Sequence, residues 1–552
     1  MKTDTTQAKT FPWWLPVGVL LIVVSRLPQM LGPNFLTDGD ESILGLMAKH
    51  MAEGRACPLF FYGQRYGFSL LEAGTAAGVF LIFGASSAAL KGSILLLWAI
   101  AWGVFFAVAR KLCGRRTALL AGLFLMAMPA WAASSMKARG GYVTAFLLTH
   151  VAVLWQLQPG SVSKKRTNLR AAGVGALTGL VFLSQPFWLI ALVPFLVLFL
   201  GKDRRWSALA VTVSSAVGIA GILSALGSNP SADYWSPSLL QNLDGLSALR
   251  QLPHRLWVHF TGAYFYYYRT PIGPWSEVCG VLWCGSLMIA VMASIVGQVA
   301  RGGVRRDRPR AIEDLDVQSG HFPDHGAPGI GAWILECGAV AAIVLMCALS
   351  LCINVDAFAF RYFLPMSSWV VMLVARRLID LRDMGSAGRW IASAAIAVLV
   401  VAGAVSMIEH ARLKPNAFTG APGGEAAPVR NLISELLAAN VRFVYCTDPM
   451  LQWVLMFESR EEIVARWAHP TDRCPQYPPA VDQARRRGER VALVATVFDE
   501  ERLETLRGQE DHAIPIIRRI DDRYLMLFDP PEMLLTRMGF VLNKVEGLPR
   551  NP

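Results

Sequence analysis

Long apolar runs separated by short charged loops constrain this chain of 552 residues more than any other feature. The hydrocarbon core of a bilayer is about 30 Å thick, so about 20 apolar residues in a helix cross it. Backbone groups in lipid must be hydrogen-bonded within their own segment, which makes such spans helical. We predict eleven spans. They lie near 13–31, 87–109, 117–134, 142–158, 171–185, 187–200, 207–227, 277–299, 332–353, 363–379 and 389–408.

The composition supports a membrane protein and argues against two other classes. Hydrophobic residues make up 54% of the chain and charged residues 17%, whereas soluble domains carry about 25% charged residues. The net charge of +12 comes from Lys and Arg that lie between the apolar runs, whereas nucleic-acid-binding proteins gather them in one basic patch. We therefore expect an α-helical polytopic membrane domain over residues 1–408 and a smaller domain over 409–552.

Lys and Arg in the connecting loops predict the orientation of the spans. With the N-terminus in the cytoplasm, the cytoplasmic segments, including a linker at 300–331, hold 22 of them, and the short loops opposite hold 9 or 10. Cytoplasmic loops carry the excess of positive charge. In a cytoplasmic (inner) membrane this orientation puts the first loop and the C-terminal domain outside the cytoplasm. Gln185-Pro186 separates the two shortest spans, which are also compatible with one kinked or re-entrant unit.

The first outer loop, residues 32–86, is too patterned for a simple connector. Its acidic run DGDE at 38–41 precedes the stretch 42–53, where apolar residues recur at helical spacing. That spacing predicts an amphipathic helix lying at the membrane surface. A second apolar segment, 68–84, contains Glu72, and a carboxylate there is costly unless it faces water or a partner.

Ionisable residues gather at the outer ends of the spans, and this clustering is the best indication of a functional site. They are Asp38, Asp40 and Glu41 of the acidic run, Lys137 and Arg139 of a short outer turn, and Arg361 at the start of the tenth span. A carboxylate can take the proton of an attacking hydroxyl, and Arg or Lys can hold a departing phosphate. Each residue type also has a structural interpretation, because acidic residues cap helices and cations at span ends reach toward the interface.

These motifs together resemble the GT-C superfamily of membrane glycosyltransferases. The similarity lies in a first span followed by Asp-Glu, an amphipathic helix and Tyr-Gly-Gln-x-Tyr-Gly, and later in a Lys-x-Arg turn and Arg-Tyr-x-Leu-Pro. It is greatest to the bacterial branch grouped with protein O-mannosyltransferases, the lipid A aminoarabinose transferase and the rhizobial galacturonosyltransferases of lipopolysaccharide. It covers about residues 10–400.

The resemblance implies an inverting enzyme that moves a sugar from a polyprenyl-phosphate donor to an envelope glycan, lipid or protein outside the cytoplasm. Asp40 would be the general base, with Asp38 as its rival. Glu41 would orient the acceptor or, with Asp40, hold a divalent cation such as Mg or Mn. The residues implied to bind the donor phosphate are Lys137, Arg139, Arg361 and Arg65. The residues implied to bind substrate are Tyr62, Gln64, Tyr66, Glu72 and Tyr142.

Physical reasoning supports the same donor class, since nucleotide sugars are cytosolic and an outer site needs a donor that reaches it through the bilayer. Two other functions stay open. One is a transporter or flippase of lipid-linked saccharides, although transporters usually show paired, interrupted spans in two related halves and this chain shows no convincing internal repeat. The other is a scaffold that displays the C-terminal domain.

The tail alternates helical and extended patterns. Helical patterns lie near 428–440, 449–460 and 499–509, and extended patterns near 442–446, 490–497 and 524–528. This order predicts a small α/β domain. Cys446 and Cys474 both fall in it, on the oxidising side of the predicted topology, so a disulfide between them is a hypothesis.

Overall fold

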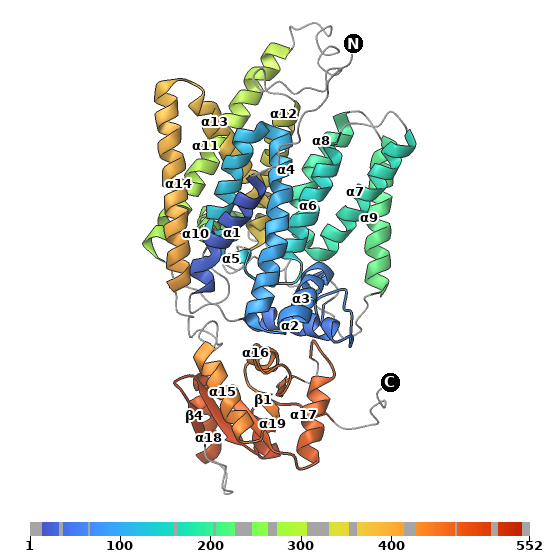
Figure 1. Cartoon of the computed structure of the whole chain (residues 1–552), viewed down its shortest axis with the longest axis vertical. Helices are drawn as coiled ribbons and strands as arrows, with labels where there is room; N and C mark the ends of the chain where they lie inside the picture. The colour runs from blue at the N-terminus through green and yellow to red at the C-terminus, as the bar shows by residue number, and fades with distance from the viewer. Residues whose placement is uncertain are drawn as a thin grey trace.

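The computed structural model describes residues 14–31, 37–64, 67–158, 164–202, 206–226, 245–262, 273–305, 330–352, 361–412, 426–469, 472–508 and 517–543. Within these ranges a helical bundle is followed by a mixed sheet with its own helices. Figure 1 shows the bundle standing above the C-terminal unit, with two shorter helices, α2 and α3, where the two parts meet.

All eleven predicted spans are helical in the structure. They correspond to α1 (Trp14–Met30), α4 (Ser87–Ala127) with α5 (Pro129–Ser134), α6 (Tyr142–Gln156), α7 (Lys164–Ser184), α8 (Leu189–Lys202), α9 (Trp206–Leu226), α11 (Pro274–Arg305), α12 (Ile330–Cys352), α13 (Leu364–Arg382) and α14 (Ser386–Arg412). Six helices of the described ranges are long and apolar enough to cross a membrane, judged by length and composition. The chain is a multi-pass membrane protein, whereas the number of eleven spans stays a prediction. A further helix, α10 (Gly245–Thr261), lies between the seventh and eighth predicted spans.

Two breaks between helices follow from single residues. α4 contains the second predicted span and most of the third, and it is kinked between them at Gly114. Gly114 has φ +80°, a backbone conformation that favours glycine. α7 ends at Ser184, and α8 follows a short 3-10 turn at Pro186–Trp188. Proline has no N–H to donate and disfavours helix in the residue before it. The two shortest predicted spans are therefore separate helices joined by a tight turn.

The C-terminal unit is the predicted small α/β domain. Its five-stranded sheet has the order β2-β1-β3-β5-β4. The parallel strands are β1 (Phe443–Cys446), β2 (Val464–Trp467) and β3 (Val491–Thr496), and the antiparallel ones are β4 (Arg518–Ile520) and β5 (Tyr524–Phe528). Its helices are α15 (Ala426–Ala438), α16 (Leu451–Glu458), α17 (Tyr477–Arg486), α18 (Glu500–Gly508) and α19 (Glu532–Arg537). Of these elements, β2, β4, α17 and α19 were not predicted.

The C-terminal domain packs against the first outer loop through α16. The loop forms α2 (Gly39–Ala52) and α3 (Leu70–Phe83). Phe457 of α16 lies against Gly45, where a Cβ would come within 2.4 Å of its ring, and its ring centroid is 6.2 Å from that of Phe80. The predicted amphipathic helix is therefore covered by protein on the side facing the C-terminal domain, and most of its residues are buried.

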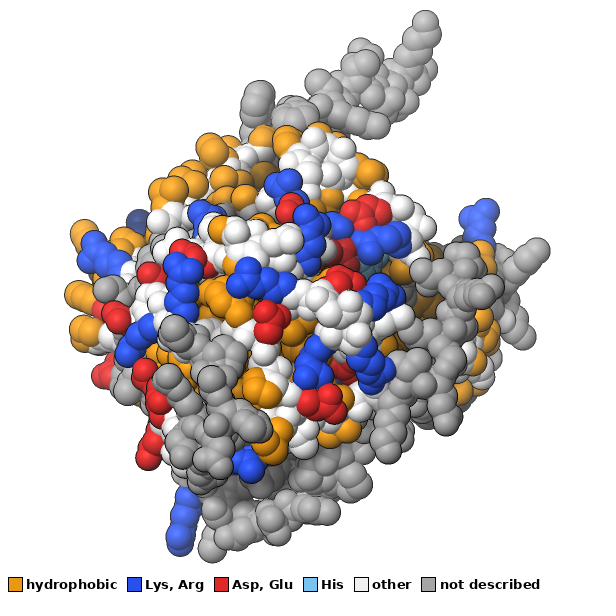
Figure 2. All heavy atoms as spheres, turned by 90° about the horizontal axis from the view of Figure 1, so that it is seen from below, with side chains coloured by type: hydrophobic (Ala, Val, Ile, Leu, Met, Phe, Trp, Pro, Cys, Tyr) orange, Lys and Arg blue, Asp and Glu red, His pale blue; other side chains and the backbone are white. Residues whose placement is uncertain are grey.

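The face of the C-terminal domain turned away from the bundle carries charges of both signs interspersed, as Figure 2 shows. The C-terminal domain also carries exposed ion pairs. Examples are Arg485–Glu532, Arg487–Glu489, Arg518–Glu435 and Arg519–Glu500. Such mixed charge is typical of a surface in water and contrasts with the exposed apolar side chains along the bundle helices.

Cys446 and Cys474 do not form the predicted disulfide, because both are buried, free thiols in the structure. Cys446 ends β1, with Asp448 as a charged neighbour, while Cys474 precedes α17, near Asp472 and Glu461. Burial raises the pKa of both thiols, that of Cys474 to about 12. A shared domain and compartment therefore do not bring these two sulfurs together.

Candidate functional site

The acidic run lies at the N-terminus of α2, where it caps the helix. Asp38 is the N-cap residue, and its carboxylate accepts a hydrogen bond from the backbone N–H of Glu41 at 3.0 Å. The Glu41 carboxylate accepts in return from the backbone N–H of Asp38 at 3.1 Å. This reciprocal capping box satisfies two backbone donors, and the positive end of the helix dipole favours the negative charges. The structural interpretation of the acidic run is thus correct for these two residues.

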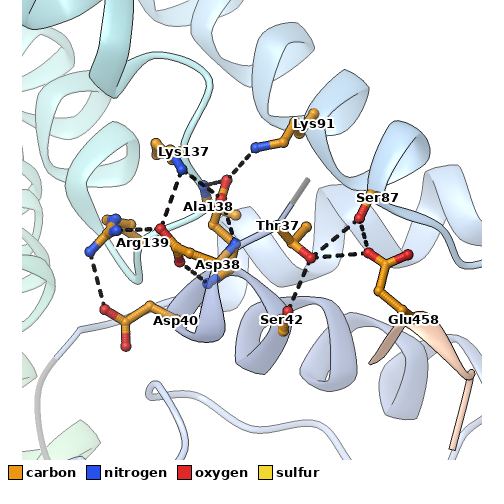
Figure 3. A network of polar contacts seen from close by, with 11 residues as sticks. Thr37, Asp38, Asp40, Ser42, Ser87, Lys91, Lys137, Ala138, Arg139 and Glu458 are labelled. Atoms are coloured by element: carbon orange, nitrogen blue, oxygen red, sulfur yellow. Dashed lines mark hydrogen bonds and ion pairs between the residues drawn. The ribbon is translucent and has the colours of Figure 1, made fainter. Parts of the chain in front are cut away.

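Glu41 is fully buried and saturated with hydrogen-bond donors. Its Oε1 accepts from Lys91 Nζ at 2.8 Å and from the backbone N–H of Ala138 at 3.3 Å. Its Oε2 accepts from Lys137 Nζ at 3.0 Å. Lys91 comes from α4 and Lys137 from the turn after α5, and both are labelled in Figure 3. A carboxylate held in this way fixes the geometry of the site and has little room for a substrate.

Asp38 is likewise held by cations. Its carboxylate pairs with Arg139 and lies 3.3 Å from Lys137 Nζ. Burial alone would raise the pKa of Asp38, but the attraction of Arg139 and Lys137 outweighs burial and holds that pKa well below its usual range. Burial would lower the pKa of Lys137, and Glu41 and Asp38 together raise it above its usual value instead. These groups stay charged at neutral pH.

Asp40 differs from its two neighbours because its side chain keeps 21% of its exposure. Its Oδ2 accepts from Arg139 Nη1 at 3.2 Å. Its Oδ1 lies 3.8 Å from Nη2 of Arg473, which is an ion pair but too long for a hydrogen bond. Among the described residues, none donates a hydrogen bond to Oδ1. Figure 3 shows the Asp40 carboxylate beyond Arg139, on the outer side of the cluster. Oδ1 of Asp40 can therefore accept a proton from a bound hydroxyl.

The basic turn that carries Lys137 and Arg139 is fixed by buried contacts of its backbone. Glu72 Oε1 accepts from the backbone N–H groups of Gly141 and Thr144 at 3.0 and 3.2 Å, so Glu72 caps α6. Gly141 has φ +98° and lies so close to Ser184 that a Cβ would meet its carbonyl oxygen at 2.7 Å. The carboxylate in the apolar segment thus has a structural partner, as its burial requires.

Arg361 lies at the start of α13, next to a segment that contacts the basic turn. Its guanidinium lies 5.3 Å from the ring centroid of Tyr362, whose ring is 4.7 Å from that of Phe187. Two residues before Phe187, Gln185 donates from Nε2 to the carbonyl of Gly140 at 3.1 Å. The turn between α7 and α8 therefore links Arg361 to the turn that holds Arg139.

The predicted substrate-binding residues separate into different places. The Tyr62 hydroxyl is 2.7 Å from Nδ1 of His50, in the contact with the C-terminal domain. Gln64 lies in the turn between the bridged residues Phe60 and Phe68, where its backbone N–H donates to Phe61 at 3.0 Å. Tyr142 is the buried first residue of α6, directly after the basic turn. Arg65 and Tyr66 lie outside the described residues.

Sequence reasoning missed two residues of this cluster. Lys91, near the start of α4, is 3% exposed and pairs with Glu41. A cation inside the start of an apolar span is costly without a partner, and this signal was available in the sequence. Arg473 comes from the C-terminal domain, more than 400 residues after Asp40, and no local pattern marks it.

The carboxylates do not fit the implied Mg or Mn ion. Within the described ranges, no group of three or more His, Cys, Asp or Glu residues could hold a metal. Asp40 and Glu41 instead face Arg139, Lys91 and Lys137, whose charges oppose a divalent cation. No step below is routed through a metal.

The structure is similar to two solved membrane proteins over most of its length. ArnT from Cupriavidus metallidurans bound to undecaprenyl phosphate has 14% identity and a TM-score of 0.56, covering 94% of this chain and 99% of ArnT. The apo form of ArnT gives 14% identity and 0.57, covering 95% and 98%. The oligosaccharyltransferase AglB from Archaeoglobus fulgidus, in complex with an inhibitory peptide and a dolichol-phosphate, gives 12% and 0.50, covering 89% and 70%.

Comparison of the sequence with protein-family models and with curated proteins finds no match. At 12–14% identity the structural similarity concerns the fold. This chain therefore shares its overall fold with ArnT and AglB.

Proposed function

We propose that this chain is an inverting glycosyltransferase that uses a polyprenyl-phosphate sugar as donor. The acceptor is a hydroxyl of an envelope glycan, lipid or protein, and the reaction takes place at the outer face of the cytoplasmic membrane. The main observation in support is the environment of Asp40. Its Oδ2 accepts a hydrogen bond from Arg139, whereas its Oδ1 accepts none from the described residues. The polyprenyl phosphates bound by ArnT and AglB support the donor class.

The proposed chemistry is a single displacement. Asp40 takes the proton of the acceptor hydroxyl as its oxygen attacks the anomeric carbon. The bond between this carbon and the phosphate oxygen breaks on the opposite face, so the configuration inverts. The leaving lipid phosphate changes from a diester with one negative charge to a monoester with a second. Lys137, Arg139 and Arg361 stabilise this charge, since cations aimed at a developing anion lower the barrier.

The geometry supports Asp40 over Asp38 as the base. Asp38 caps α2 and pairs with Arg139 and Lys137, so a hydroxyl proton would have to displace one of these partners. Glu41 is buried under three donors from other segments of the chain. We assign both residues to positioning the cations, and Asp40 to the proton transfer.

Mass analysis of envelope glycolipids and glycoproteins, from cells with and without this protein, tests the proposal. We expect the loss of one sugar unit from one class of molecule when the protein is absent. Wild-type protein restores it, whereas Asp40→Asn does not, although it reaches the membrane at the same level. An unchanged envelope would contradict the proposal.

Reconstituted vesicles distinguish an enzyme from a transporter. In reconstituted vesicles with the identified donor and acceptor, an enzyme transfers sugar when both substrates are on the side of Asp40. A flippase would instead move the intact lipid-linked saccharide across the bilayer and form no new glycosidic bond. Arg487→Gln, on the exposed face of the C-terminal domain, serves as the control with unchanged activity.

A further inference from the structure

Arg473 of the C-terminal domain reaches the acidic cluster of the membrane domain. It follows β2 and precedes α17, and its Nη2 lies 3.8 Å from Asp40 Oδ1. Its guanidinium lies 5.3 Å from the ring centroid of Phe61. The backbone of Gly63, with φ +71°, is so close that a Cβ there would lie 2.7 Å from the Cα of Arg473. These contacts tie Arg473 to the first outer loop.

The ion pairs around the N-terminus of α2 balance without Arg473. Three carboxylates, Asp38, Asp40 and Glu41, meet three cations of the membrane domain. Those cations are Lys91, Lys137 and Arg139. Arg473 adds a fourth cation to this ion-pair cluster, and its neighbour Asp472 adds a fourth carboxylate that interacts with its charge.

Part of the Arg473 guanidinium has no partner in the described structure. Nη1 is buried, and no described residue accepts a hydrogen bond from it. Leaving a buried donor of a charged group unpaired is costly. A guanidinium with an unpaired, desolvated N–H suits an anionic oxygen, and phosphate is a group that such forks bind well.

The topology of the C-terminal domain explains how Arg473 comes to this place. In sheets with parallel strands, ligands bind outside the carboxyl ends of those strands. After the carboxyl end of β1, Met450 packs on Gly39, where a Cβ would lie 2.7 Å from its sulfur. After the carboxyl end of β2 comes Arg473. This edge of the sheet therefore faces the N-terminus of α2.

We propose that Arg473 binds the phosphate of the lipid-linked donor, so that the C-terminal domain supplies part of the donor site. This inference rests on the proposed function. A polyprenyl-phosphate sugar carries one negative charge on its phosphate, whose oxygen would accept a hydrogen bond from the unpaired Nη1 of Arg473. When the sugar leaves, the second charge on the phosphate strengthens the same contact, and the docked C-terminal domain is then required for donor binding.

Binding of undecaprenyl phosphate to the detergent-solubilised full chain tests this, measured by native mass spectrometry titration. We expect Arg473→Gln to weaken binding at least about tenfold, because a hydrogen bond to a charged group is lost. Arg473→Met keeps an apolar stem over Phe61 and should lose as much. Arg473→Lys keeps the charge and should lose less. Arg487→Gln removes a guanidinium from the exposed face and should bind like the wild type.

The outcomes separate this inference from the proposed function. Wild-type protein that binds undecaprenyl phosphate while Arg473→Gln and Arg473→Met bind it equally well overturns the role of Arg473 alone. Equal weakening by Lys, Gln and Met, with an unchanged thermal midpoint, would also overturn it, because charge would then not matter. Wild-type protein that does not bind this lipid overturns the proposed donor class and the inference with it.

Discussion

The two ends of α2 carry opposite charges and meet different partners. At the N-terminal end, carboxylates of the helix face cations of the membrane bundle. At the C-terminal end, Lys49 and His50 of the helix face Glu461 of the C-terminal domain. Both arrangements complement the helix dipole, which favours anions at the N-terminus and cations at the C-terminus.

The two ends differ in how completely their polar atoms are paired. Glu461 accepts from Lys49 at 2.7 Å, from Tyr477 at 2.7 Å and from Arg55, and it lies 3.0 Å from Nε2 of His50. These donors outweigh the effect of burial and hold the pKa of Glu461 well below its usual range. At the other end, Asp40 Oδ1 accepts no hydrogen bond within the described structure. We call the C-terminal end of α2, with Glu461, the closed end, and the N-terminal end, with Asp40, the open end. We infer that the closed end holds the domains together and that the open end reacts.

The largest expected effect is on turnover in Asp40→Asn. Because Asn cannot take the acceptor proton, transfer should fall about 10²–10⁴-fold. The thermal midpoint should change by less than about 2 °C, because the Asp40 side chain is partly exposed and Arg139 keeps Asp38 as a partner. Initial rates and thermal unfolding in detergent check both parts. Near-normal transfer by Asp40→Asn would point to Asp38 as the base.

Glu41→Gln should behave in the opposite way. Removing the charge leaves Lys91, which is 3% exposed, as an uncompensated buried cation, and breaking such pairs costs about 3–5 kcal/mol. We expect a large drop in the thermal midpoint. The double variant Glu41→Gln with Lys91→Met should recover part of it, because no buried charge remains. A Glu41→Gln protein of normal stability that has lost turnover would instead show that Glu41 touches a substrate.

Much of the fold could be predicted because lipid leaves few choices. An apolar run in a bilayer must be helical, which is why the segments that became α1 and α14 were found within a few residues. The capping role of Asp38 was also legible, since Asp followed three residues later by Glu is a capping-box pattern. The resemblance brought Asp40, Lys137 and Arg139 together, and the structure places them in one ion-pair cluster.

The docking of the C-terminal domain could not be predicted. Lys49 and Glu461 are separated by more than 400 residues and meet through packing of α16 on α2. β2 has only four residues and carries Arg466 at its centre, where burial is compensated by Asp482, so it lacks the apolar pattern of a strand. Arg473 and Glu461 therefore follow from tertiary structure and not from local sequence.

Glu461→Gln tests the closed end of the comparison. It removes a carboxylate that accepts several charged hydrogen bonds, each worth about 1.5–3 kcal/mol. We expect a net loss of about 2 kcal/mol in docking and faster hydrogen exchange in the last turns of α2 and in α16. Glu532→Gln, whose carboxylate pairs with Arg485 on the surface, should leave exchange unchanged. Equal exchange in the two variants would show that apolar packing alone docks the domain.

The smallest expected effect concerns Asp472, next to Arg473 at the open end. Burial raises the pKa of Asp472 to about 6. The native state thus binds this proton more tightly than the unfolded state, so stability should fall as the pH rises from about 4 to about 6. Above that range the ionised group costs about 1–2 kcal/mol, after allowance for its remaining exposure.

Asp472→Asn should therefore raise the thermal midpoint at pH 7.5 and leave it unchanged at pH 4, where the wild-type carboxyl is already neutral. Thermal unfolding of both proteins across this pH range measures the difference. If Asp472→Asn lowered the midpoint at pH 7.5, its charge would be stabilising Arg473. The ionised Asp472 carboxylate would then be a partner of Arg473 and would compete with a donor phosphate for its guanidinium.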